Sequence, residues 1–234
     1  MHTKKVSVQF FTPKNYYEHF AHDVYFLLVE NFSQTFFVGG MVRDILLHKK
    51  INDIDIATAA SPQRVSVILR NHGIAVNTEH KNFGVIKAIH KDREVEITTF
   101  RKEVYTDSRY PKVTFTTSLL IDSKRRDFTV NSLYLQAKNG IIYDPCNGLL
   151  DIKNKHLKLI GNPATKLTQD PLRIIRAYKF AHLFGLMFDS KTERALRKSF
   201  SLVHTISQTR LQQEINNIKN LKTKKFILQV LKNS

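Results

Sequence analysis

Two carboxylates stand two positions apart in a segment that is otherwise apolar. Asp53 and Asp55 alternate with isoleucines in INDIDIAT, residues 51–58. We predict a strand here, and because alternate residues of a strand face the same side, both carboxylates project together. Paired charges of this kind repel each other and are costly to desolvate, and one divalent cation relieves both effects. The spacing therefore points to Mg²⁺, which prefers hard oxygen ligands, although an isolated Asp-X-Asp is more often a solvated strand face.

Glu96 is the best candidate for a third carboxylate. It lies in REVEITTF, residues 93–100, a second predicted strand whose apolar residues would face the core while Glu96 points away from it. On a strand next to the first, Glu96 would complete a site for two metal ions about 4 Å apart, the arrangement used in nucleotidyl transfer. We therefore predict that Asp53, Asp55 and Glu96 are catalytic, and that Asp53 and Asp55 bind the metal.

Groups suited to phosphate precede the carboxylates. TFFVGG, residues 35–40, reads as a strand that ends in two glycines, and a short helix is predicted over 41–50. Gly39 and Gly40 let the backbone approach a bulky anion because no Cβ is in the way. The N–H groups at a helix N-terminus favour phosphate, and Arg43 adds a positive charge one turn into the helix. Together with the carboxylates, Gly39, Gly40 and Arg43 point to a bound nucleotide.

The chain carries a large excess of positive charge. Its 234 residues include 37 Lys and Arg against 20 Asp and Glu, which gives a net charge of +17. Residues 151–234 hold 17 of the basic and 5 of the acidic residues, so the excess is concentrated there. This balance favours a polyanionic partner such as RNA, although a solvated basic surface from a Lys-rich proteome would give the same balance.

Cysteine content and hydropathy limit the cellular compartments in which the protein is expected. Cys146 is the only cysteine, which excludes a disulfide within one chain and a zinc site built on cysteines. No run approaches the roughly 18 apolar residues that a membrane span needs. We therefore expect a cytoplasmic protein with no membrane partner, and the sequence leaves its oligomeric state open.

Residues 1–150 mix strand and helix patterns. Besides the strands above, an antiparallel pair is predicted over 83–90 and 93–100, and helices over 15–32, 41–50 and 61–73. The last of these has Ser61 as its N-cap and Gly73 as its stop. The segment 103–112 reads as a loop, and 128–136 fits a strand or a helix equally well.

From residue 151 onward, strand patterns stop. Four helices are predicted, over 170–184, 190–203, 209–221 and 224–231. The predicted fold class is therefore α+β, with a catalytic domain over 1–150 followed by an all-α domain over 151–234.

Five motifs, in order, resemble those of one enzyme family, and the first motif consists of two segments. VGGMVRD and DIDIAT, residues 38–44 and 53–58, are similar to the first signature of the class II tRNA nucleotidyltransferases (CCA-adding enzymes) and of the closely similar bacterial poly(A) polymerases. VEITTFR, at 95–101, resembles the family's strand with the third carboxylate, and RRDFTVNSL, at 125–133, resembles its ribose-reading motif. DPCNGLLDI, at 144–152, resembles the hinge between head and neck, and QDPLRIIRAYKF, at 169–180, resembles the base-reading helix. The resemblance implies a nucleotidyltransferase-fold head, a mixed β-sheet with flanking helices, followed by an all-α neck that reads the base and binds RNA.

The segment 125–131 combines cations, a carboxylate and an amide. Arg126 is suited to grip a triphosphate, and Asp127 to accept a hydrogen bond from a ribose 2′-OH, which would select ribonucleotides over deoxyribonucleotides. The resemblance implies the same two roles and gives Asn131 the role of orienting the site. Without the resemblance, an ion-pair patch on the surface would explain these residues.

Asp170 and Arg173 open the predicted helix over 170–184. Asp170 is placed as an N-cap before Pro171, and Arg173 and Arg176 share the face opposite an apolar stripe. Taken alone, these are a helix cap and a solvated face. The resemblance implies that Asp170 and Arg173 read the base, since cytosine and adenine each offer an amine to a carboxylate and a ring nitrogen to a guanidinium. It also implies that Arg176 reaches the triphosphate.

Two positions depart from the residues usual in the family. Gln169 stands where a Glu usually precedes the aspartate. Lys179 stands where the family usually has a third Arg, and the resemblance makes it a candidate nucleotide-binding residue. A Lys keeps the charge but loses bidentate geometry, which affects nucleotide preference and rate. The segment 103–112 is similar to the family's flexible loop, which favours addition of the final A.

TRLQQEI, residues 209–215, resembles the last segment of the family's neck, before the body and tail helices. The chain ends 19 residues later. This is expected of a natural short form, of a truncated chain, or of a catalytic half that needs a partner.

The resulting hypothesis is a Mg²⁺-dependent, template-independent RNA nucleotidyltransferase. It would add C and A from CTP and ATP to the tRNA 3′ end, with the 3′-OH attacking the α-phosphate in line by a two-metal mechanism. Two alternatives stay open: a poly(A) polymerase that extends RNA 3′ ends with ATP, and an inactive RNA-binding protein.

Overall fold

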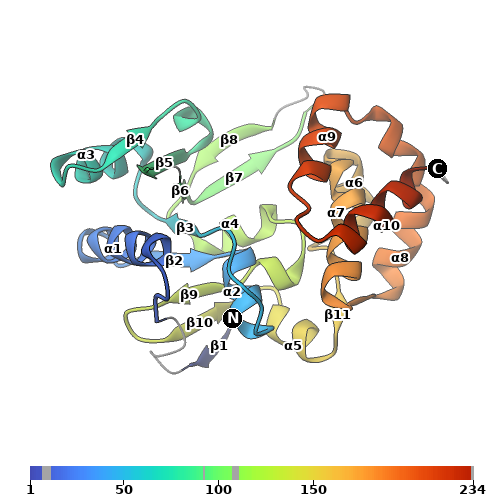
Figure 1. Ribbon diagram of the computed structural model, residues 1–234, viewed down its shortest axis with the longest axis horizontal. Coiled ribbons are helices and arrows are strands. Elements are labelled where there is room, and N and C mark those ends of the chain that lie inside the picture. Colours follow the sequence, from blue (N-terminus) through green and yellow to red (C-terminus); the bar gives the residue numbers. More distant parts are fainter. Residues whose placement is uncertain (7–11, 92, 107–110, 233–234) are drawn as a thin grey trace. The chain divides into compact units, whose positions relative to one another are not determined.

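The computed structural model of the chain describes residues 1–6, 12–91, 93–106 and 111–232 and contains two compact units (Figure 1). The first comprises Met1–Arg126 and Asn131–Gly148, and the second comprises Asp127–Val130 and Leu149–Ser234. The sequence patterns place a division near residue 150 and give no sign that residues 127–130 pack with the second unit.

Eight strands within the described residues form one mixed sheet in the first unit. They are His2–Lys5 (β1), Thr35–Val38 (β2), Asp55–Thr58 (β3), Ala75–Asn77 (β4), Val85–His90 (β5), Arg93–Thr99 (β6), Tyr134–Gln136 (β9) and Ile141–Asp144 (β10). Their order across the sheet is β1-β10-β9-β2-β3-β6-β5-β4. β3 and β6 run parallel, whereas β5 and β6 form the antiparallel pair predicted from the sequence. The parallel pair carries two of the predicted catalytic carboxylates, Asp55 and Glu96.

Helices flank this sheet. They are Tyr16–Asn31 (α1), Gly40–Leu46 (α2), Pro62–Asn71 (α3), a 3₁₀ turn at Lys81–Phe83 (η2), and Leu119–Arg125 (α4). The helices predicted over 15–32, 41–50 and 61–73 are thereby confirmed. In α3 the Ser61 hydroxyl accepts a hydrogen bond from the N–H of Arg64 at 3.4 Å, and Gly73, with φ +72°, follows the end of the helix. α1 and α3 lie next to each other at one side of the sheet (Figure 1).

The predicted strand over 51–58 is shorter in the structure. β3 begins only at Asp55, because its ladder with β6 starts at the pair formed by Asp55 and Glu96. Asp53 therefore lies ahead of the strand rather than within it. The position of Asp53 depends on contacts other than the sheet ladder.

The structure decides the conformation of two further segments, one predicted as a loop and one left undecided by the sequence. Both ends of the predicted loop over 103–112 are strand, because Arg101–Val104 (β7) pairs antiparallel with Lys112–Phe115 (β8), and residues 107–110 lie outside the described part of the chain. The undecided segment 128–136 contains a 3₁₀ turn at Thr129–Asn131 (η3) and then β9.

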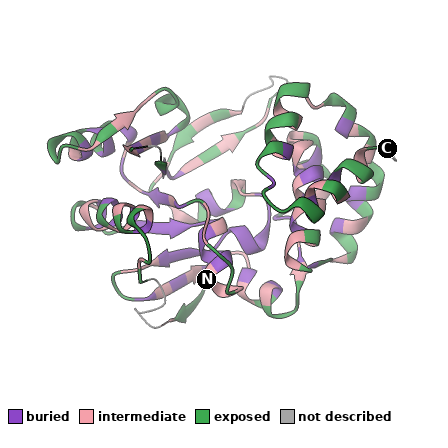
Figure 2. Cartoon of the chain, viewed as in Figure 1, coloured by how far each residue is buried: buried purple, intermediate pink, exposed green. Residues whose placement is uncertain are grey.

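Aromatic side chains fill both faces of the central strands. Phe36, Phe100 and Tyr134 belong to one buried cluster, while on the other face Tyr25 of α1 stacks on Phe37 with ring centroids 4.4 Å apart. These central strands are correspondingly buried (Figure 2). Burial on both faces fixes the register of β2 against β3, and so fixes where Asp55, at the start of β3, lies.

The second unit is built mainly from helices. They are Gly148–Lys153 (α5), Pro163–Gln169 (α6), Leu172–Phe184 (α7), Ser190–Ser199 (α8), a 3₁₀ stretch at Phe200–Thr205 (η4), Gln208–Asn216 (α9) and Leu221–Lys232 (α10). The predicted fold class and the four predicted helices are confirmed. The sequence does not predict α6 or a parallel ladder of His156–Leu157 (β11) with Met187–Phe188 (β12), since two residues are too few to show a period. In both units, no helix of the described residues is long and apolar enough to cross a membrane.

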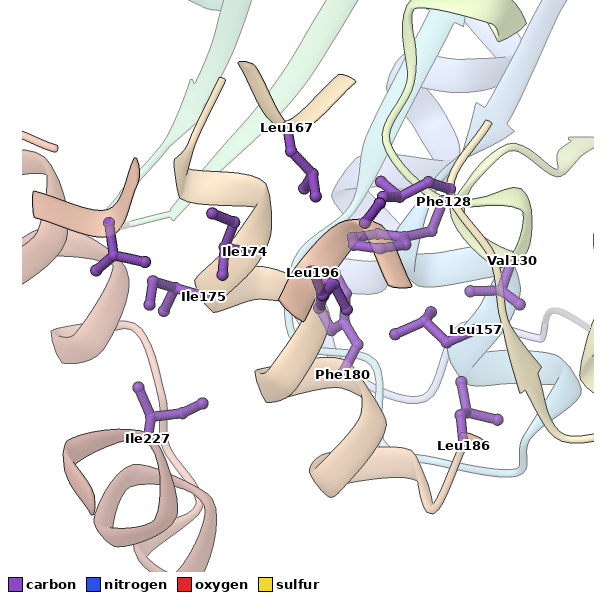
Figure 3. Close-up of a cluster of buried hydrophobic side chains, with 14 of the residues drawn as sticks. Phe128, Val130, Leu157, Leu167, Ile174, Ile175, Phe180, Leu186, Leu196 and Ile227 are labelled. Atoms are coloured by element: carbon purple, nitrogen blue, oxygen red, sulfur yellow. The ribbon is translucent and has the colours of Figure 1, made fainter. Parts of the chain in front are cut away.

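Buried apolar side chains join the helices of the second unit (Figure 3). Phe128 and Val130 contribute from the segment 127–130, and Ile227 contributes from α10. The ring of Phe128 packs edge-on against Phe180 of α7, with centroids 5.7 Å apart. This contact holds Asp127, the residue before Phe128, close to α7.

Candidate active site

Two of the predicted catalytic carboxylates lie side by side. Asp55, the first residue of β3, is paired with Glu96 on the parallel strand β6. Paired residues on adjacent strands are about 5 Å apart and project to the same face. Ile54 and Ile56 are 1% and 0% exposed, whereas Asp55 is half-buried and Asp53 is exposed. Burial therefore alternates from Asp53 to Ile56, although Asp53 precedes the strand, whereas Ala57 and Thr58 are both buried.

The side chains predicted to bind the metal ion are carboxylates, the type of ligand that suits a hard divalent cation. The negative charge of Asp53 helps to raise the pKa of Asp44, where burial is the larger cause and Arg43 opposes the shift. Negative charge is thus concentrated here, and carboxylate oxygens are the ligands that Mg²⁺ prefers. Among the residues that the structure describes, no three His, Cys, Asp or Glu side chains are close enough to hold a metal ion together.

Gly39 lies between the carboxylate and a cation. Its φ of +75° is unfavourable for a residue with a Cβ. A Cβ placed there would lie 3.6 Å from Oδ2 of Asp55 and 3.7 Å from Nη1 of Arg126. The absence of a side chain at Gly39 therefore keeps open the space next to both groups, as the Gly-Gly motif predicts.

Arg43 and Asn131 belong to a buried network beside this turn. Arg43 is 5% exposed, and its Nε and Nη2 donate to Oδ1 of Asp44 at 2.9 and 2.7 Å. Its Nη1 donates to Oδ1 of Asn131. A Cβ at Gly40 would lie 3.3 Å from Nη2 of Arg43, so the second glycine makes room for this guanidinium. In the structure, the hydrogen bond between Arg43 and Asn131 lies beside the turn at Gly39 and supports it.

Arg126 is hydrogen-bonded to two side chains, Tyr134 and Asp122, that the sequence motifs did not identify as part of the site. Its Nε donates to the Tyr134 hydroxyl at 2.9 Å and to Oδ2 of Asp122 at 3.3 Å. Tyr134 itself donates to the same carboxylate oxygen at 2.7 Å. Burial alone would lower the pKa of Arg126, but Tyr134 and Asp122 raise it above its ordinary value, so the guanidinium stays charged. Asp122 stands four residues before Arg126 in α4, and this helical spacing is the one signal in the sequence that links them.

In the second unit, Asp127 and Arg176 are paired with each other. Oδ2 of Asp127 lies 2.7 Å from Nη2 of Arg176, and Oδ1 of Asp127 accepts the N–H of Phe128 at 2.7 Å. The Arg176 side chain is 36% exposed and that of Asp127 is 8% exposed. The two residues predicted to contact ribose and triphosphate thus form one charged edge.

The start of α7 differs from the expected cap. Asp170 ends α6, and Pro171 takes the cap position of α7, yet Oδ1 of Asp170 accepts the N–H of Leu172 at 3.4 Å. Arg173 is 5% exposed rather than on a solvated face, because its Nη1 donates to the carbonyl of Lys166 in α6 at 2.7 Å. Helical periodicity alone could not reveal α6 as the neighbour that buries Arg173.

Two residues of α9 contact predicted site residues of α7 and its start. Arg210 lies 3.0 Å from Oδ1 of Asp170, and Glu214 forms an ion pair with Lys179. Burial lowers the pKa of Lys179, and Glu214 opposes that shift. The sequence pattern predicts this helix, but only the likeness of residues 209–215 to the family's neck connects it with the family. The first unit thus brings together Gly39, Asp55, Glu96 and Arg126, and the second brings together Asp127, Arg176, Asp170 and Arg210.

Comparisons with known proteins agree with this arrangement. The chain is 40% identical over 187 residues to a CCA-adding enzyme of Streptococcus pyogenes serotype M5 (strain Manfredo), covering 79% of this chain and 45% of that protein. The structure of the present chain is similar to that of the Bacillus stearothermophilus CCA-adding enzyme in complex with CTP. The TM-score is 0.74 and the identity is 30%, over 86% of this chain and 48% of the other. It is also similar to a tRNA nucleotidyltransferase complexed with a primer tRNA and an incoming ATP analogue, with TM-score 0.70 and 26% identity over 88% and 59% of the two chains.

The chain spans about half the length of these relatives. CCA-adding nucleotidyltransferases in general depend on divalent metal ions. A profile of the poly(A) polymerase head domain matches residues 35–158, more than half of the chain, and confirms the resemblance drawn from the motifs. The chain therefore belongs to the poly(A) polymerase head domain family, the nucleotidyltransferase family that includes the CCA-adding enzymes.

Proposed function

We propose that the chain is the catalytic part of a template-independent RNA nucleotidyltransferase that adds C and A from CTP and ATP to the tRNA 3′ end. The observation that carries the reaction class is the pairing of Asp55 with Glu96 beside Gly39 and Arg126. The substrate is supported by similarity to CCA-adding enzymes and to structures that contain CTP, an ATP analogue or tRNA. A cytoplasmic location belongs to the same proposal.

The first unit would carry out the chemistry. The tRNA 3′-OH attacks the α-phosphate in line, a new phosphodiester forms, and pyrophosphate leaves. Mg²⁺, when bound, would lower the pKa of the attacking hydroxyl and neutralise charge on the phosphate oxygens. Asp53, Asp55 and Glu96 would hold it. Arg126, fixed by Asp122 and Tyr134, would bind triphosphate oxygens across the space that Gly39 leaves open.

The second unit would select the nucleotide. Asp127 is proposed to accept the ribose 2′-OH, and Arg176, which already pairs with Asp127, to bind phosphate. Asp170 and Arg173 are proposed to match the amine and ring nitrogen of cytosine or adenine. Uracil and guanine would leave these charged groups without matching partners. Lys179, paired with Glu214, would support this helix face rather than bind phosphate as a bidentate group.

The test uses a tRNA that ends before CCA and, separately, an unstructured RNA. Each is incubated with the protein, Mg²⁺ and the four NTPs singly and together, and the 3′ ends are sequenced. We expect addition of C, C and A to the tRNA and none of U or G. Long A tails on either RNA would instead indicate a poly(A) polymerase, and RNA binding without incorporation would indicate an inactive RNA-binding protein.

A further inference from the structure

Tyr17 of α1 contacts the backbone on both sides of the carboxylate site. Its hydroxyl accepts the N–H of Ile54 at 3.2 Å and donates to the carbonyl of Glu94 at 2.9 Å. Ile54 lies between Asp53 and Asp55, and Glu94 lies two residues before Glu96. One hydroxyl thus connects the two chain segments that carry all three predicted catalytic carboxylates.

This link lies where the sheet no longer connects those segments. Pairing between β3 and β6 begins at Asp55 and Glu96, and the residues before Asp55 are outside the strand. The Tyr17 hydroxyl continues the connection one position further, at Ile54. Asp53 is the next residue and is exposed, so the bond at Ile54 constrains the backbone from which its carboxylate projects.

The ring of Tyr17 is itself fixed. The guanidinium carbon of Arg93 lies 4.5 Å from the ring centroid, a cation–π contact. Burial raises the pKa of the Tyr17 hydroxyl, and the charges of Asp53 and Asp55 raise it further against the Ile54 hydrogen bond. The hydroxyl therefore stays protonated at neutral pH and can donate to Glu94 while it accepts from Ile54.

We propose that Tyr17 is a positioning residue, which sets the spacing of Asp53 and Asp55 relative to Glu96 and thereby the affinity of the site for a divalent cation. The inference rests on the proposed function, because it takes these carboxylates as the metal-binding groups. Tyr17 lies in α1, outside the matched residues 35–158, and neither its residue type nor its spacing marks it in the sequence. Groups that orient metal ligands typically contribute about 10- to 100-fold to metal affinity or activity.

The test compares Tyr17→Phe, which keeps the ring and its contact with Arg93, with Tyr16→Phe as the matched control. Tyr16 is the neighbouring tyrosine, is 62% exposed, and packs on His90 with ring centroids 4.7 Å apart. Three quantities are measured: hydrogen exchange of the Ile54 amide by NMR, Mn²⁺ affinity by electron paramagnetic resonance, and the Mg²⁺ dependence of nucleotide incorporation.

For Tyr17→Phe we expect faster exchange at Ile54 with little change elsewhere, and Mn²⁺ affinity reduced by about tenfold or more. We also expect a higher Mg²⁺ requirement with the KM for CTP unchanged, while Tyr16→Phe behaves as the wild type. Wild-type exchange at Ile54 or wild-type Mn²⁺ affinity in Tyr17→Phe overturns the inference. So does a general rise in exchange with a lower Tm, which would make Tyr17 a packing residue. If the wild type binds Mn²⁺ but incorporates no nucleotide, the proposed function fails while the positioning role is still decided by the binding data.

Discussion

At the scale of single side chains, the position of Asp55 is fixed by its neighbours in the first unit. It starts β3, pairs with Glu96, and lies beside the space left by Gly39. Replacing it with the isosteric amide, Asp55→Asn, removes the charge and keeps the shape. We expect kcat to fall by about 10³-fold or more, since charge stabilisation by a bound metal contributes several kcal/mol to the transition state. The measurement is single-turnover incorporation of CTP.

The matched control is Asp23→Asn, which removes a carboxylate from an exposed position of α1. Its activity should equal that of the wild type, and the thermal unfolding midpoints of the two variants should be close. Substantial turnover by Asp55→Asn at unchanged Mg²⁺ would remove Asp55 from the catalytic set.

Base selection is a second prediction at this scale. Asp170→Asn and Arg173→Ala should relax the exclusion of UTP and GTP, because mismatched bases no longer leave a charged group without its partner. An unsatisfied buried polar group costs about 1 to 3 kcal/mol, which corresponds to roughly tenfold to a few hundredfold in discrimination. The measurement is kcat/KM for each of the four NTPs on one tRNA acceptor.

Arg173 also donates to the Lys166 carbonyl, so Arg173→Ala should lower stability as well. Ratios among the four NTPs separate the two effects, because a loss of stability lowers all four rates together. Arg197→Ala, at a side chain that is 76% exposed in α8, is the control. If both variants lowered kcat/KM equally for all four NTPs, the result would contradict base reading. Asp170 would then be a helix cap, and Arg173 would stabilise the packing against α6.

At the scale of elements, α4 organises a buried charge network. Asp122 is 0% exposed and accepts from Arg125, Arg126 and Tyr134. Burial alone would raise the pKa of Asp122, but the charges of Arg126 and Arg125 outweigh it, and the pKa lies below its usual 3.8. A carboxylate with a lowered pKa stabilises the fold above its unfolded-state pKa and loses that contribution as the pH falls through the folded value.

The pH dependence of the stability of Asp122→Asn follows from the direction of this pKa shift. At pH 7 we expect the variant to be less stable than the wild type by about 3 kcal/mol, because a buried ion pair is broken. The difference should shrink as the pH falls below the usual carboxyl pKa of 3.8, where the wild type also loses the charge. Chemical denaturation at a series of pH values measures this. A constant difference across that range would show that Asp122 acts through packing rather than through its charge.

At the scale of the whole molecule, charge is distributed unevenly along the chain. Residues 151–234 hold 17 basic and 5 acidic residues, and Lys222, Lys225 and Lys232 are exposed on α10. Phosphate binding by lysine releases counterions from RNA, so we expect RNA binding to weaken steeply with salt. Replacing these three lysines with Gln should weaken binding to all sequences. It should also reduce the slope of log K against log salt by about 0.7 to 0.9 for each phosphate that the variant no longer neutralises.

The matched control replaces Lys4, Lys5 and Lys14, three exposed lysines of the first unit, with Gln. It changes net charge equally and should leave the slope unchanged. Binding is measured by fluorescence anisotropy between low and moderate salt. Equal effects of the two triple variants would show that net charge, and not a surface on α10, determines RNA affinity.

The sequence by itself determined those features that depend on neighbours along the chain. Ser61, Pro62 and Gly73 mark the ends of α3 because capping is local, and alternating burial around Ile54 and Ile56 follows from the period of an extended chain. Family likeness added the roles proposed for Asp127, Asp170 and Arg173. The strand and helix patterns thus predicted the fold class, and the motifs supplied the residues that we propose for the site.

Only the tertiary structure decided which of these groups meet. The pairing of Asp55 with Glu96 depends on strand order, and the bond from Tyr17 to Glu94 spans 77 positions in the sequence. Arg43 reaches Asn131 across 88 positions. Contacts of this kind result from long-range packing of the core, which no local period records. For that reason Tyr17 and Asp122 look ordinary in the sequence and acquire their significance only in the folded chain.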